Sequence, residues 1–145
     1  MLRVELLLMN PSGYMAAFVN TLCRYANVTC HVFEPQAHTN YDYSTLFSDH
    51  VDVHAWGFGK SRPRFTRDSP DLLFVAGWQV PAYRRRARRL RATSIRVLGM
   101  DNPWLGTVRQ RIGSSARLLT VKPFFDYAMI PGDRQRDFAR RLGFG

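Results

Sequence analysis

Glutamate is nearly absent from this chain of 145 residues, which contains only Glu5 and Glu34. The two lie far apart, so hydrolysis by paired carboxylates would have to use aspartates, and no aspartate spacing points to it. Cysteine is equally scarce, with only Cys23 and Cys30. A cytosolic chain with so few cysteines usually keeps them reduced, so we expect two free thiols and no disulfide.

Long apolar segments are also missing. The longest apolar runs are Leu6–Met9 and Leu72–Gly77, whereas a membrane-spanning helix needs about 20 apolar residues. The first residues carry an acid, Glu5, inside their apolar stretch, which is atypical of a signal peptide. We therefore expect a cytoplasmic protein, with contact limited to the inner face of the membrane if it meets one.

Lysine is rare and arginine abundant, at two and nineteen residues, and the formal net charge is +10. This charge is unevenly placed. Residues 1–70 hold six basic and six acidic residues, whereas residues 71–145 hold fifteen basic and five acidic ones. The second half therefore carries the whole excess, and such a field attracts the phosphates of nucleotides, anionic lipids or nucleic acid.

Strand-like and helix-like patterns alternate through most of the chain. Continuous apolar runs indicate buried strands, and apolar residues three and four positions apart indicate helices. Turn-forming residues separate them. The expected strands are Leu2–Met9, Val28–Glu34, Val51–Trp56, Asp71–Gly77, Ile95–Met100 and Tyr127–Ile130, and the expected helices are Tyr14–Tyr25, Pro81–Arg91, Trp104–Leu119 and Asp133–Leu142.

This alternation predicts a single α/β domain over residues 1–145, a Rossmann-like parallel sheet with helices on both faces. Ligands of such sheets bind beyond the carboxyl ends of the strands. Three loops should lie at that edge, Asn10–Tyr14, Gly77–Gln79 and Asp101–Thr107.

Two patterns imitate known motifs without completing them. Gly57–Ser61 resembles the end of a phosphate-binding loop, but the position that requires the first glycine is His54. His50 and His54 are four residues apart with aspartates nearby, yet the alternation around them is that of a strand and a third ligand is missing. We expect neither a nucleoside triphosphate site nor a metal site here.

The segment Tyr83–Arg91 is an arginine-rich helix in which Tyr83, Ala87 and Leu90 share one face. A solvated outer helix of the sheet is the favoured interpretation. An anionic membrane surface contacted through Arg84–Arg91 is the second, because basic amphipathic helices suit such surfaces. Nucleic acid is the least favoured, since no stacking aromatic residue is interleaved with the arginines.

The segment Asp101–Gly106 follows a predicted strand at its carboxyl end. Carboxylate and amide oxygens accept hydrogen bonds from sugar hydroxyls, and an indole covers the apolar face of a pyranose. The segment therefore suits a sugar-binding site. An equally weighted alternative is that it begins a helix, with Asn102 as N-cap, Pro103 in the first turn and Trp104 in the core.

Residues 70–144 resemble the N-terminal domain of GT-B glycosyltransferases, of the large retaining family often described as glycosyl transferases group 1. The segments that carry the resemblance are Pro70–Trp78, Gly99–Arg111 and Phe125–Gln135, which runs into Phe138–Phe144. Members of this family transfer a sugar from a nucleotide-sugar donor to a glycan or lipid-linked acceptor with retention of configuration. We expect the nucleotide sugar as substrate, no further cofactor and no metal.

The resemblance implies that this chain is the acceptor-binding half. In the family, a C-terminal domain holds the nucleotide sugar through two glutamates separated by seven residues, and Glu5 and Glu34 do not match that spacing. We therefore expect the donor-binding domain to be absent, the chain alone to be inactive, and no catalytic residue to be assignable within it.

The resemblance implies a role for the first loop, and the expected sheet geometry adds roles for residues of the acceptor side. The family's first loop is usually rich in glycine and approaches the donor phosphates, whereas Asn10–Tyr14 holds a single glycine. Arg109 is expected two turns into a helix, where it would meet an acceptor phosphate. The expected donor-phosphate loop is Ser12, Gly13 and Tyr14, and the expected acceptor pocket is Trp78, Asp101, Asn102, Trp104 and Arg109.

Two other functions stay open at this point. The first is a non-catalytic Rossmann-like or flavodoxin-like binding module; a phosphorylatable receiver would need an acidic cluster near the first strand, and residues 8–13 contain no acid. The second is an arginine-rich nucleic-acid binder, although we expect no specific nucleic-acid partner. The sugar-transfer assignment requires the turn at Trp78 and the segment Asp101–Trp104 to lie side by side on one edge of a parallel sheet.

Overall fold

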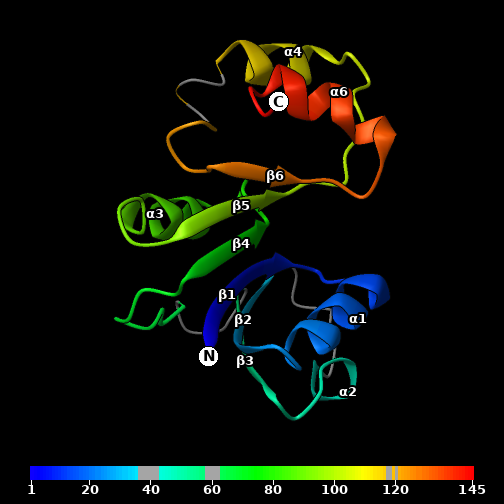
Figure 1. The fold of residues 1–145 in the computed structure, drawn as a ribbon. Coiled ribbons are helices and arrows are strands. Elements are labelled where there is room, and N and C mark those ends of the chain that lie inside the picture. Colours follow the sequence, from blue (N-terminus) through cyan, green and yellow to red (C-terminus); the bar gives the residue numbers. More distant parts are fainter. Residues whose placement is uncertain (36–42, 58–62, 117–118, 120) are drawn as a thin grey trace.

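The computed structural model describes residues 1–35, 43–57, 63–116, 119 and 121–145. Its centre is a six-stranded, entirely parallel sheet, as the sequence predicts (Figure 1). The strand order β3-β2-β1-β4-β5-β6 reverses between β1 and β4, as in the doubly wound Rossmann arrangement. The strands are β1 (Leu2–Met9), β2 (Ala26–Glu34), β3 (Val51–Gly57), β4 (Leu72–Ala76), β5 (Ile95–Gly99) and β6 (Tyr127–Met129).

Helices cover both faces of the sheet, because each face of the central strands is apolar. On one face Leu6 and Leu8 pack against Ala16 and Val19 of a helix. On the other, alternate residues such as Leu7 pack against two different helices. The helices are α1 (Gly13–Leu22), α2 (Tyr43–Leu46), α3 (Pro81–Arg89), α4 (Val108–Ser115) and α6 (Asp133–Arg141), of which α1 lies on the first face and α3 and α6 on the second.

The predicted start of the fourth helix was wrong. α4 begins at Val108, and its N-cap is Thr107, whose side chain accepts a hydrogen bond from the Gln110 amide at 3.3 Å. Asn102 therefore caps no helix. Gly106 has a φ of +66°, which interrupts any helix that would start at Pro103.

The crossover from β3 to β4 contains no helix in its described part, residues 63–71, and residues 58–61 of the phosphate-loop imitation lie outside the described part. Phe65 takes the place of a crossover helix. Its ring lies 5.0 Å from the His31 ring and 6.4 Å from the Tyr83 ring, on the face that α3 covers. The crossover thus closes the core over β1 and β2.

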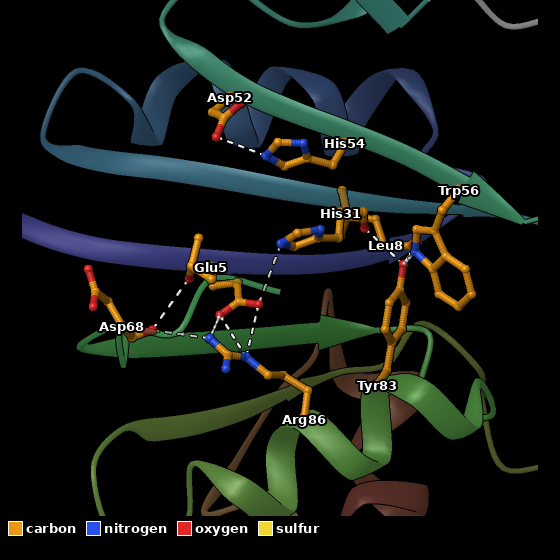
Figure 2. Close-up of polar contacts among 10 residues, drawn as sticks. Glu5, Leu8, His31, Asp52, His54, Trp56, Asp68, Tyr83 and Arg86 are labelled. Carbon is orange, nitrogen blue, oxygen red and sulfur yellow. Dashed lines mark hydrogen bonds and ion pairs between the residues drawn. The ribbon is translucent and has the colours of Figure 1, made fainter. Parts of the chain in front are cut away.

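A buried ion pair crosses this face of the sheet (Figure 2). Arg86 of α3 donates from Nε to both carboxylate oxygens of Glu5 on β1, at 3.2 and 3.1 Å, and from Nη2 to Oε2 at 2.7 Å. Nη2 also donates to the Asp68 carbonyl at 3.2 Å. The expectation that the arginines of this helix are solvated is therefore wrong at Arg86, which is 7% exposed.

The Tyr83 hydroxyl ties α3 to three strands. It lies 2.9 Å from the carbonyls of both Leu8 and His31 and accepts a hydrogen bond from Trp56 Nε1 at 3.2 Å. These partners belong to β1, β2 and β3, near their carboxyl ends. A single side chain thus fixes the three strands relative to the helix.

His31 is fully buried beside the ion pair, and burial lowers its pKa to about 4. His31 is therefore neutral at pH 7, and its contact with Glu5 at 3.6 Å is not an ion pair. Burial raises the pKa of Glu5, and the bond from Arg86 opposes that rise. The His31 ring stacks on the His54 ring at 5.0 Å.

Separating the ion pair should be far more damaging than replacing it. Arg86→Met leaves a buried carboxylate unpaired and should lower the free energy of unfolding by about 3–5 kcal/mol. The double variant Glu5→Leu/Arg86→Met removes both charges and should recover most of that loss. Urea denaturation of the three proteins measures the difference; a double variant no more stable than Arg86→Met would contradict this account.

Stability should also decline in acid because of His31. Between pH 6.5 and about 4 the unfolded histidine binds a proton that the folded one does not, so the free energy of unfolding falls as the pH falls, by on the order of 3 kcal/mol over that window. The raised pKa of Glu5 acts in the opposite sense and offsets part of the decline. His31→Phe retains the ring contacts and should flatten the dependence in urea denaturation. An unchanged slope would rule out His31 as its source.

Candidate functional site

A cleft of about 200 Å³ lies beyond the carboxyl ends of β1, β4, β5 and β6. It sits where the strand order reverses, which is where ligands bind in open parallel sheets. Two of the three loops expected to matter, those after β1 and β5, contribute to its wall. The cleft brings together Ser12, Tyr14 and Asp101 from the predicted site residues.

The first wall of the cleft is the start of α1. Ser12 is the N-cap, in an extended conformation, and its side chain makes no capping hydrogen bond. The first intrahelical bond runs from the Ala16 amide to the Ser12 carbonyl at 3.0 Å, so the amides of residues 13–15 precede the helical ladder. A Cβ atom on Gly13 would meet nothing within 4 Å. This wall offers backbone donors and the positive end of a helix dipole.

The opposite wall comes from the ends of β5 and β6 and carries an exposed carboxylate, Asp101. Its carbonyl accepts a hydrogen bond from Gln135 Nε2 of α6 at 2.9 Å, which fixes the backbone there. The described lining residues include no lysine or arginine. The cleft therefore lies between the start of α1 and the segment that carries Asp101, and most of its described lining residues are apolar.

Trp78 and Trp104 follow β4 and β5 at the same edge of the sheet, because those strands pair in parallel. That placement confirms the predicted geometry. Neither indole is among the described residues that line the cleft. Trp78 packs against the core cluster that includes residues of α3. The Trp104 ring lies 5.7 Å from the Phe138 ring, and the Arg141 guanidinium lies 4.5 Å from the centroid of the Trp104 ring. Their role in acceptor binding stays a prediction.

Asn102 and Arg109 are exposed and lie outside the described lining of the cleft. Arg109 is the second residue of α4, so its predicted position two turns into a helix was wrong. Its part in acceptor binding stays a prediction, as does that of Asn102.

No group of three potential metal ligands occurs in the described ranges of the chain. His54 lies on β3, 2.9 Å from the Asp52 carboxylate, and His50 precedes that strand. The strand interpretation of this segment is confirmed. Across the same residues, no helix is long and apolar enough to cross a membrane.

Sequence reasoning missed the floor of the cleft, which includes Phe74, Gly99, Met129 and Ile130. These residues look like ordinary strand positions in the sequence. The one available signal was Gly99, a glycine inside a strand, which marks a close approach by a neighbour. A Cβ atom on Gly99 would overlap the Phe74 ring.

Gly99→Ala should therefore displace the Phe74 ring and lower the free energy of unfolding by about 1–3 kcal/mol. The matched control is Gly113→Ala, where a Cβ atom meets nothing within 4 Å and the helix should gain up to about 1 kcal/mol. Urea denaturation of both variants gives the comparison. Equal stability of the two would show that the Gly99 contact imposes no constraint.

No protein-family model matches the chain, and neither the curated proteins nor the solved structures include one with significant similarity to it.

Proposed function

We propose that this chain is the acceptor-side domain of a retaining glycosyltransferase, which transfers a sugar from a nucleotide-sugar donor to a glycan or lipid-linked acceptor. The observation that carries the proposal is the cleft at the reversal of strand order, with the start of α1 on one wall and Asp101 on the other. This arrangement also agrees with the resemblance of residues 70–144 to GT-B enzymes.

The α1 wall suits the donor diphosphate. Backbone amides at a helix N-terminus donate to phosphate oxygens, and the helix dipole favours their negative charge. Gly13 is not among the described lining residues, but it lies between Ser12 and Tyr14, which are, and it adds no side chain there. The Ser12 hydroxyl makes no capping bond, so it adds a further donor at the same point.

The Asp101 wall suits sugar hydroxyls. A carboxylate repels a diphosphate but accepts hydrogen bonds from hydroxyl groups, so the two walls assign phosphate to one side and sugar to the other. Met129 and Ile130 beside Asp101 provide apolar surface for the C–H face of a pyranose. On this proposal, a second domain outside these 145 residues supplies most donor contacts and the stabilisation of the leaving diphosphate.

The proposal predicts that UDP and UDP-glucose shift the amide resonances of residues 12–16 in a ¹⁵N NMR titration. Ser12→Asp should keep α1 intact, because aspartate is a good N-cap and complements the helix dipole. Its carboxylate should nevertheless lower diphosphate affinity at least about tenfold. Thr107→Asp, the same kind of change at the N-cap of α4 outside the cleft, should bind like the unmodified chain.

Shifts that spare residues 12–16, or that persist unchanged in Ser12→Asp, would contradict the assignment of the diphosphate to α1. A turnover assay with the same nucleotide sugars tests the division between domains. The chain alone should catalyse no transfer, and robust transfer by it would overturn that division.

A further inference from the structure

α4 presents its apolar side chains outward. Val108 and Ile112 are 73% and 65% exposed, and Leu105, just before the helix, is 72% exposed. The one residue of α4 that is buried is Ser114. A helix that covers a sheet normally does the reverse, so this face is built for something other than the core of this domain.

The exposed face has the layout of a helix lying in an interface. At about 100° per residue, Val108 and Ile112 lie within one narrow stripe. Arg111 falls on one side of that stripe and Arg109 on the other, and both are exposed. Arginines in these positions extend their charged ends to either side while their stems lie along apolar surface.

The stripe is held rigidly in place. The Gln110 side chain accepts from the Leu105 amide and donates to the Pro103 carbonyl, both at 2.8 Å. Arg111 Nε donates to the Gly106 carbonyl at 2.9 Å. These bonds hold the loop against the helix, so that Leu105 lies exposed beside the stripe. Because the loop is already ordered, binding would cost little further conformational entropy.

We propose that Leu105, Val108 and Ile112, with Arg109 and Arg111, form a docking face for an anionic lipid bilayer. The charge supports this occupant: residues 102–116 contain no acid, so the face complements anionic headgroups while its apolar side chains enter the acyl boundary. A second copy of the chain is disfavoured, because three side chains fall well short of the roughly 800 Å² per partner that a stable interface buries.

α3 is a poorer candidate than its arginine content indicates. Tyr83, Ala87 and Leu90 are buried, so the outer surface of α3 offers charge without a large apolar side chain to insert. The α4 face also lies close to the cleft along the chain, since Asp101 precedes Leu105 by one short loop. The inference goes beyond the proposed function and stands without it, because membrane binding needs no nucleotide sugar.

The test is flotation of the full chain with vesicles of phosphatidylcholine, with and without about a third phosphatidylglycerol. Only the anionic vesicles should bind the chain, and raising NaCl to about 0.5 M should release it. Val108→Gln/Ile112→Gln removes apolar surface without changing charge, and Arg109→Gln/Arg111→Gln removes charge. Each pair should lower the vesicle partition coefficient about tenfold or more.

The controls match each change elsewhere on the surface. Tyr25→Gln/Ile95→Gln alters two exposed apolar residues, and Arg85→Gln/Arg88→Gln alters two exposed arginines of α3. Each control pair should leave partitioning within about twofold of the unmodified chain, because lone exposed apolar or charged residues add little. Thermal unfolding confirms that every variant is folded.

Three outcomes would overturn the proposal. One is equal binding, or none, to the two kinds of vesicle. Another is a control pair as damaging as the pair it matches. The third is a dimer in sedimentation velocity that Val108→Gln/Ile112→Gln dissolves, since this would show that a second copy covers the stripe.

Discussion

The pairing of Glu5 with Arg86 is the constraint on which the rest of the domain depends. Glu5 lies inside a central strand of an all-parallel sheet, where both faces are covered and a lone carboxylate would be very costly to bury. Arg86 is the group that compensates it, and it does so from α3 while also bonding the carbonyl of Asp68 in the crossover. One interaction therefore sets the position of three segments that are distant in the sequence. Because the crossover leads directly into β4, it also sets where β4 lies beside β1, and that junction forms the back of the cleft.

The polar groups of this face lie at two positions along the length of the strands. The ion pair and the buried His31 lie in the middle of the sheet, and the Tyr83 hydroxyl lies nearer the carboxyl ends, where it meets the carbonyls of Leu8 and His31. Leu8 also lines the cleft. The end of β1, and with it the loop that begins α1, is thus anchored from the opposite face of the sheet. Such anchoring restrains the end of β1, from which the loop to α1 begins, and the proposed phosphate site would bind more tightly if that loop needed no further ordering.

The sequence predicted the sheet well because parallel strands are read from continuous apolar runs, and β1 and β4 are such runs. It failed at Asn102 and Pro103, whose local signals for a helix start are sound but are overridden by Gly106 and by the bonds that the Gln110 side chain makes. It also treated Arg86 as one arginine among many, since a helical pattern cannot show that a glutamate eighty-one residues earlier faces it. A sequence shows the local preference of a segment for helix or strand, but it does not show which distant residue a side chain will contact.

The placement of charge explains why a strongly basic chain has a cleft without lysine or arginine among its described lining residues. Within the cleft, the groups suited to an anion are backbone amides and a helix dipole, which need no side chain and leave the floor apolar. The arginines are distributed over the outer helices, where α3 holds one inward for Glu5 and exposes others. α4 differs from α3 because its arginines flank exposed apolar residues. The basic residues behind the net charge of +10 thus have two roles: Arg86 pairs with Glu5 in the core, and exposed arginines create a positive surface potential. Of α3 and α4, only α4 places exposed arginines beside exposed apolar side chains whose burial in a bilayer would be favourable.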